Sequence, residues 1–266
     1  TTALLRRPRT SRALLRSKNS CSALLGATSG RTTLNGEGLQ HQDGHSLLNA
    51  IAYPTVRAYD PAFAYEVATI IRDGLRRMYV DEEDIFYYLT IYNENYIQPA
   101  KPGDVDEGIV RGLYRFADRP AGGTHGATIL FSGPAHAAAR AAQQELLEHY
   151  GIAADLWSAT SYKKLREEAS EVERWNRLHP AAAPRVPFVT QALQSASGPV
   201  IAVSDYMKMV PDQVGRFVPR RFVPLVDRQI FDSATKTRQR LPALVQLHPT
   251  FNRSRHIYPG ACSDKP

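Results

Sequence analysis

The sequence predicts an α/β fold in which parallel strands alternate with helices. Short runs of β-branched and aromatic residues read as strands, and longer stretches carry apolar residues at helical spacing. The two kinds of segment alternate along the chain, which favours a parallel sheet. With 266 residues, 43% of them hydrophobic and 22% charged, the chain is long enough for one large or two small soluble domains.

The first α/β unit is predicted between residues 55 and 92. A short strand over 55–59 ends at Asp60-Pro61, a pair that suits the start of a helix. Apolar residues at helical spacing then predict a helix over 62–79, and the aromatic run 85–92 predicts a buried strand. Asn93-Glu94-Asn95-Tyr96 follows at the carboxyl end of that strand, where open α/β sheets bind ligands.

A second unit repeats this alternation. Strands are predicted over 128–131, 154–158 and 199–203, with helices over 134–149 and 162–178. Between the two units, residues 99–124 are rich in Pro and Gly and read as a linker containing one short ordered piece around Ile109–Phe116. Residues 220–266 show no convincing period and are predicted to form an irregular basic tail.

The net charge of +7 comes from the two ends of the chain. Residues 1–36 carry seven Arg or Lys and no acid, residues 217–266 have a net charge of +6, and the body between them has a net charge of −6. A nucleic-acid binder usually carries its basic patch on the folded domain, so this distribution disfavours nucleic acid as a partner. No apolar run is long enough for a membrane span.

Two features bear on the cellular compartment. Cys21 and Cys262 lie near opposite ends, which argues against a disulfide framework and favours a reducing compartment such as the cytoplasm. Residues 1–22 are rich in Arg, Ser and Leu, a composition shared by mitochondrial transit peptides and by disordered basic arms. We expect a cytoplasmic protein, with a mitochondrial location as the alternative.

The segment Gly30–Ser46 is the strongest candidate for a ligand site. It contains four glycines, two acids and two histidines in seventeen residues. Glycines let the backbone approach a ligand closely, and histidine can change its charge near neutral pH. His41 and His45 have the spacing of a zinc-binding helix, but Gly44 opposes a helix and the acid is misplaced for that motif. Taken alone, a loop-stabilising His41 and a helix-capping Glu37 would also explain the pattern.

Several motifs, in order, resemble the homodimeric pyruvate dehydrogenase (acetyl-transferring) first component, a thiamine-diphosphate enzyme. The resemblance spans residues 24–219. Its motifs are Leu25-Gly26-Ala27-Thr28-Ser29-Gly30 running into Gly36-Glu37-Gly38-Leu39-Gln40-His41, then 58–66, 92–96, 108–114, Glu173-Arg174-Trp175-Asn176, 178–180 and 204–208. The Gly-Leu-Gln-His context and the Glu173–Asn176 stretch count against a transketolase-type sugar transferase.

The resemblance implies a division of the chain and a function. Residues 24–98 would be the C-terminal part of a pyrimidine-binding domain and 125–219 part of a transketolase-like C-terminal domain, with 1–23 a basic disordered arm. The full-length enzyme would be a homodimer that uses thiamine diphosphate and Mg²⁺ to decarboxylate pyruvate oxidatively. It would then pass the acetyl unit to a lipoyl group on an acetyltransferase partner.

The resemblance also implies site residues. His41 would face the thiazolium ring and the bound 2-oxo acid, position the substrate and stabilise the covalent adduct, whereas Glu37 would orient His41 or carry part of the proton network. The Gly-Asp-Gly motif that binds magnesium and diphosphate is absent from the chain, as is the Thr-Asp-Gly-Phe-Gly segment expected after Pro219. We therefore expect this chain to be an incomplete, inactive fragment; the alternative is a non-catalytic remnant or interaction module.

Overall fold

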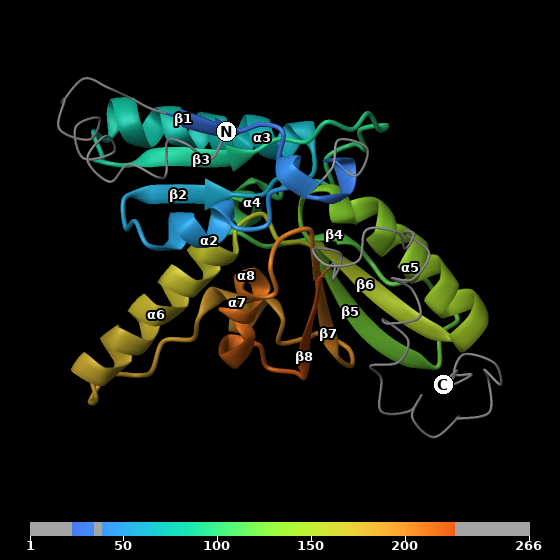
Figure 1. The fold of residues 1–266 in the computed structure, drawn as a ribbon. Coiled ribbons are helices and arrows are strands. Elements are labelled where there is room, and N and C mark those ends of the chain that lie inside the picture. Colours follow the sequence, from blue (N-terminus) through green and yellow to red (C-terminus); the bar gives the residue numbers. More distant parts are fainter. Residues whose placement is uncertain (1–22, 35–38, 227–266) are drawn as a thin grey trace, which may run out of the picture.

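The computed structural model describes residues 23–34 and 39–226, which form two sheets flanked by helices (Figure 1). The smaller sheet has the strand order β1-β3-β2, and all its strands are parallel. Its elements are β1 (Ala23–Gly26), β2 (Val56–Tyr59) and β3 (Phe86–Thr90), with the helices α2 (Ser46–Ile51) and α3 (Ala64–Leu75). A π-helical turn, η3 (Arg76–Val80), extends α3.

The larger sheet has the order β4-β6-β5-β7-β8, with β4 antiparallel and the others parallel. Its strands are β4 (Tyr114–Ala117), β5 (His125–Phe131), β6 (Ile152–Ser158), β7 (Val200–Ser204) and β8 (Phe222–Val226). The accompanying helices are α4 (Asp106–Arg111), α5 (His136–Tyr150), α6 (Tyr162–Leu178), α7 (Phe188–Ala192) and α8 (Met209–Asp212). Helix α5 lies on one side of this sheet, and α6, α7 and α8 lie on the other (Figure 1).

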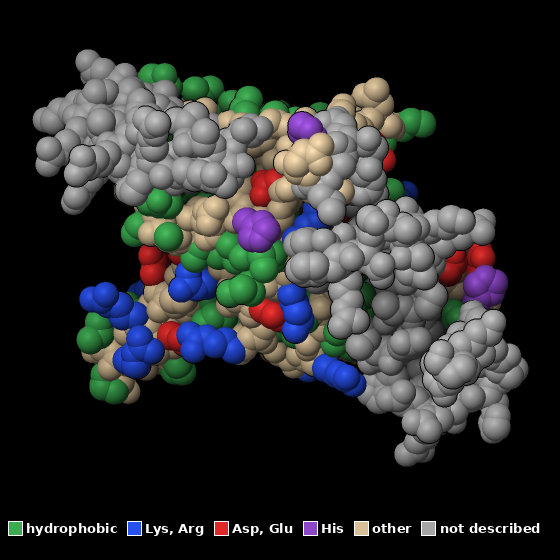
Figure 2. All heavy atoms as spheres, viewed as in Figure 1, with side chains coloured by type: hydrophobic (Ala, Val, Ile, Leu, Met, Phe, Trp, Pro, Cys, Tyr) green, Lys and Arg blue, Asp and Glu red, His purple; other side chains and the backbone are tan. Residues whose placement is uncertain are grey.

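Local sequence signals set the ends of the long helices. The Ser161 hydroxyl accepts a hydrogen bond from the Lys164 amide at 3.1 Å and so caps the start of α6. Helix α5 ends at Gly151, whose φ of +62° is a left-handed conformation that glycine adopts without strain. Basic and acidic side chains are interspersed over α6 on the face shown in Figure 2, as expected for a charged helix.

Two hydrophobic cores run through the molecule, and each spans both sheets. Successive residues of one strand point to different cores: Val200 and Ala202 of β7 belong to one, and Ile201 and Val203 to the other. In the same way Tyr88 of β3 packs in the first core and Leu89 in the second. Burial on both faces explains why the strands read as continuous apolar runs rather than as alternating ones.

The structure confirms the α/β class with parallel strands and corrects the expected organisation in three places. Segment 99–124 is more than a linker, because it contains α4 and its strand β4 is hydrogen bonded to β6. The expected irregular tail begins with β8, which pairs with β7 and places Pro224 in an edge strand, where proline is tolerated. Ala23, expected in the basic arm, starts β1.

The other predicted features of the ends, including Cys21 and Cys262, lie outside the described residues. Within the part that the structure describes, no helix combines the length and apolar character needed to cross a bilayer.

A buried carboxylate joins the two sheets at the start of α3. Glu66 is fully buried and accepts hydrogen bonds from the amides of Ala62 (2.5 Å) and Phe63 (3.1 Å). It also accepts hydrogen bonds from the Tyr114 hydroxyl of β4 and the Ser158 hydroxyl of β6, both at 2.6 Å. Burial raises the pKa of Glu66, and the four donors oppose that rise.

We expect Glu66→Ala to lower the free energy of unfolding by about 2–4 kcal/mol, because it leaves buried donors without an acceptor. Glu66→Gln should cost only about 1 kcal/mol, since its amide oxygen can still accept from the two backbone amides. Urea unfolding followed by circular dichroism measures both values. Glu107→Ala is the control, because Glu107 pairs with Arg111 at 2.8 Å on an exposed face of α4. Equal unfolding midpoints for Glu66→Ala and Glu107→Ala would contradict the inference that Glu66 stabilises the contact between the two sheets.

Candidate functional site

The carboxyl ends of strands from both sheets meet in one region. Asp60 directly follows β2; its amide donates to the Thr160 carbonyl beyond β6 at 2.7 Å, and its carbonyl accepts from the Gly133 amide beyond β5 at 3.2 Å. The Ser29 amide beyond β1 donates to the Ile91 carbonyl beyond β3 at 2.9 Å. Ligands of open α/β sheets bind outside the carboxyl ends of the strands, so this junction is the candidate site.

Asp60 is a buried acid of the junction, with 3% of its surface exposed. Its Oδ1 accepts hydrogen bonds from the Thr90 hydroxyl at 2.6 Å and from the Tyr92 hydroxyl. Burial raises the pKa of Asp60 to about 6 despite these hydrogen bonds, and the nearby charge of Asp205 adds to the rise. Asp60 therefore holds a proton at a higher pH than an ordinary aspartate.

The loop after β1 carries the predicted site residues. His41 ends a short 3-10 turn, η2 (Leu39–His41), and its side chain is exposed. Glu37 lies outside the described residues, so its predicted role beside His41 stays a prediction. An exposed imidazole on a loop at the edge of the junction is accessible to a small molecule.

The second histidine of the loop has a different setting. His45 is exposed and precedes α2, so His41 and His45 do not share a helix in the way a zinc-binding helix requires. The Asp43 carboxylate accepts from the amides of His45 (2.9 Å) and Ser46 (3.0 Å) and starts α2. Asp43 therefore shapes the turn at the start of α2.

Three contacts hold the base of this loop. The Asp43 amide donates to the Gly30 carbonyl at 2.9 Å. The Arg31 amide donates to Asp205 Oδ2 at 2.8 Å, and the Met207 amide donates to the Gly44 carbonyl at 3.1 Å. Asp205 and Met207 follow β7 of the larger sheet. The loop with His41 is thus attached to both sheets.

Sequence reasoning missed three members of the junction. It assigned Asp60 to a helix start, placed Tyr92 at the end of a strand and included Asp205 only in the motif 204–208. The available signal was positional, because each of the three lies at or just beyond the carboxyl end of a predicted parallel strand. Asn93, Glu94 and Asn95, which were also considered for the cleft, are exposed.

Among residues 23–34 and 39–226, no group of three or more His, Cys, Asp and Glu side chains could hold a metal ion. The Gly-Asp-Gly motif is also absent from the full sequence. No step through thiamine diphosphate is therefore derived from these residues.

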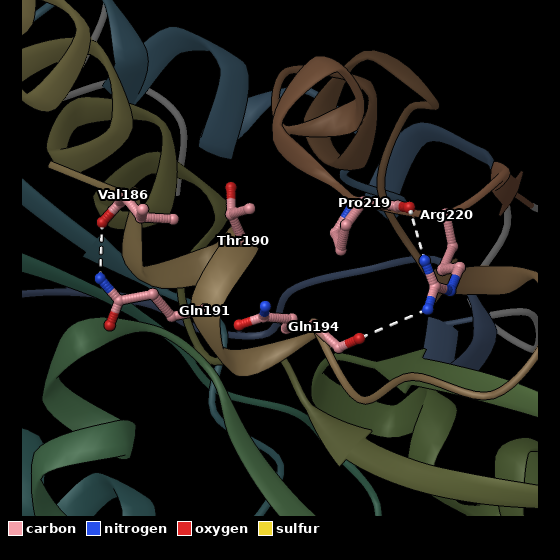
Figure 3. Close-up of a pocket in the computed structure, with 6 residues that line it drawn as sticks. All are labelled: Val186, Thr190, Gln191, Gln194, Pro219 and Arg220. Carbon is pink, nitrogen blue, oxygen red and sulfur yellow. Dashed lines mark hydrogen bonds between the residues drawn. The ribbon is translucent and has the colours of Figure 1, made fainter. Parts of the chain in front are cut away.

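A separate pocket of about 560 Å³ lies away from this junction. It is lined by Val186, Thr190, Gln191, Gln194, Pro219 and Arg220 (Figure 3). Its segments precede β7 and β8 and so lie at the amino ends of these strands. The Arg220 guanidinium donates to the carbonyls of Ala196 and Pro219, both at 3.2 Å. This pocket lacks the cluster of acids and hydroxyls that marks the junction.

The raised pKa of Asp60 predicts a dependence of stability on pH. As the pH rises from the ordinary value of 3.8 to about 6, the unfolded chain loses this proton while the folded chain keeps it. Stability therefore falls through this window, and the loss is complete above it. We expect Asp60→Asn, which cannot ionise, to gain about 3 kcal/mol relative to the wild type between about pH 4 and pH 8 in urea unfolding.

Asp118→Asn is the matched control, because Asp118 is exposed and pairs with Arg115 at 3.0 Å. If the stability difference between Asp60→Asn and the wild type is the same at both pH values, Asp60 does not titrate as described.

Family models match most of the described chain. The pyruvate dehydrogenase E1 component middle domain matches residues 16–99, and the transketolase-like TK C-terminal domain matches residues 112–221. Among solved structures, a split gene transketolase, described as an inactive beta4 tetramer, is similar with a TM-score of 0.51 at 18% identity. That similarity covers 89% of this chain and 66% of the other, and it supports the fold alone.

Curated relatives carry one name, pyruvate dehydrogenase E1 component. The protein of Mycobacterium tuberculosis is 50% identical over 204 residues, or 76% of this chain. Those of Pseudomonas aeruginosa and Escherichia coli are 48% and 46% identical over 74% of this chain. The chain spans about 22% of the length of each of these relatives. With two consecutive domain matches and this level of identity, the chain belongs to the pyruvate dehydrogenase E1 component family.

Proposed function

We propose that the full-length protein is a thiamine-diphosphate- and Mg²⁺-dependent pyruvate dehydrogenase (acetyl-transferring) component. It decarboxylates pyruvate oxidatively and transfers the acetyl unit to a lipoyl group on an acetyltransferase partner in the cytoplasm. The observation that carries this proposal is the identity of about half of some 200 aligned residues to relatives of that name. The Gly30–Ser46 loop lies within the matched middle domain.

His41 is the proposed catalytic residue of this segment. Loss of carbon dioxide from a 2-oxo acid leaves negative charge, and an imidazole can donate a hydrogen bond to it. The exposed side chain of His41 at the end of η2 leaves its ring accessible to substrate. Glu37, four residues earlier, is proposed to orient His41 or to carry part of the proton network.

We also propose that the full-length protein is a homodimer. Ile71, Leu75 and Tyr79 recur every fourth residue along α3 and η3 and are 44%, 51% and 62% exposed. Such a stripe on one helix face is an apolar surface suited to another subunit. Neither nucleic acid nor a membrane is part of the proposed function.

The 266-residue chain alone should release no carbon dioxide from pyruvate, even with thiamine diphosphate and Mg²⁺ added. The reason is the missing Gly-Asp-Gly motif, since loss of an essential catalytic group commonly lowers rates by several orders of magnitude. Manometry or a coupled assay on the purified chain measures this, with the Escherichia coli relative as the positive control. Sustained turnover by the chain would contradict the proposed incompleteness.

Replacing the matching part of the Escherichia coli relative by residues 24–219 tests the site itself. In this chimera, His41→Ala should lower kcat about a hundredfold or more, the scale of general acid–base or electrostatic help. His45→Ala is the control and should keep kcat within about threefold, because His45 is exposed and does not cap α2 with its side chain. Both variants should keep the Tm of the chimera. If the chimera folds and is inactive, the non-catalytic alternative is favoured; if His41→Ala keeps full turnover, the site assignment fails.

A further inference from the structure

The loop that carries His41 is attached at its neck, which consists of Gly30, Arg31, Asp43 and Gly44. The Asp43 amide closes the neck on the Gly30 carbonyl at 2.9 Å. Both sides of the closed neck then contact the turn after β7: Arg31 donates to the Asp205 carboxylate, and Gly44 accepts from the Met207 amide. A single turn of the larger sheet therefore contacts both sides of a loop that starts from the smaller sheet.

Three of the four neck residues are buried and tightly packed, and Asp43 is half-buried. Gly30, Arg31 and Gly44 are buried, and Asp205 has 1% of its surface exposed. Gly30 has a φ of +80°, and a Cβ there would lie 2.7 Å from Asp205 Oδ2. A Cβ at Gly44 would lie 1.9 Å from a guanidinium nitrogen of Arg31. The two glycines let the neck come close enough for these hydrogen bonds to form.

The turn after β7 is itself fixed to the larger sheet. The Ser204 hydroxyl accepts from the Tyr206 amide at 3.2 Å and from the Ser132 hydroxyl beyond β5 at 3.3 Å. The Val210 amide donates to the Met207 carbonyl at 2.8 Å at the start of α8. The contact points of the neck therefore belong to a rigid frame formed by β5, β7 and α8.

We propose that Asp205 is a positioning residue for His41. Its carboxylate and the neighbouring Met207 amide hold the neck. His41 belongs to the loop that the neck closes and lies two residues before Asp43. A catalytic group must be held within a fraction of an ångström of its productive place by surrounding contacts. The hold on the loop is independent of any activity, whereas its consequence for turnover rests on the proposed function.

Hydrogen exchange on the full 266-residue chain tests directly whether Asp205 holds the neck of the loop. Asp205→Ala removes the acceptor, so the amides of Arg31 and Asp43 should exchange about tenfold faster or more, while β5 and β6 keep their protection. Asp205→Asn retains a side-chain oxygen that can accept from Arg31, and it should restore protection to within about threefold of the wild type. Asp212→Ala is the control, because Asp212 is exposed and pairs with Lys208 at 3.5 Å in the next turn of chain.

Unchanged exchange at the neck in Asp205→Ala would overturn the proposal. Equal acceleration in the neck, β5 and β6 would also overturn it, because Asp205 would then support the fold as a whole. In the chimera with the Escherichia coli relative, Asp205→Ala should lower kcat about tenfold and Asp205→Asn should recover most of it. If His41→Ala is fully active there, the proposed catalytic role of His41 fails, and the exchange result still decides whether Asp205 holds the loop.

Discussion

Two buried acidic residues near the start of α3, Asp60 and Glu66, tie the smaller sheet to the larger one. Asp60 links the end of β2 to the segments beyond β5 and β6 through its backbone amide and carbonyl, and the Glu66 carboxylate links α3 to β4 and β6. Neither acid has a basic side chain among the partners described above; hydroxyl and amide donors surround them instead. Because buried polar groups must be hydrogen bonded, the backbone bonds of Asp60 and the donors around Glu66 fix the relative placement of the sheets and of the loops attached to them.

These contacts leave the supporting residues of the loop in the packed interior and its histidine at the surface. Asp60, Asp205 and the neck residues Gly30, Arg31 and Gly44 are buried, whereas His41 at the end of η2 is exposed. This division is common in α/β proteins, where a packed scaffold positions functional side chains on surface loops. The proposed chemistry at His41 depends on this arrangement, since an exposed side chain on an unsupported loop could not keep one orientation toward a substrate.

The sequence predicted those elements whose residues carry a local pattern of secondary structure. The predicted strands over 55–59, 85–92 and 154–158 correspond to β2, β3 and β6 because burial on both faces produces continuous apolar runs. Strand β1 has only four residues, Ala-Leu-Leu-Gly, without a β-branched side chain, and β8 contains Pro224, so neither has the local pattern of a strand. The resemblance marked His41, but the partner of Arg31 lies 174 residues away at Asp205 and no local pattern predicts such a pairing.

The two hydrophobic cores have a consequence for how this chain can be divided. The two family matches end and begin at residues 99 and 112, which suggests a natural place to cut the chain. Each core, however, draws side chains from both matches, with Val56 and Tyr88 packed alongside Leu130 and Trp157 in one of them. Separating the chain there would expose core side chains on both pieces. The two matched domains therefore depend on each other to bury their apolar side chains.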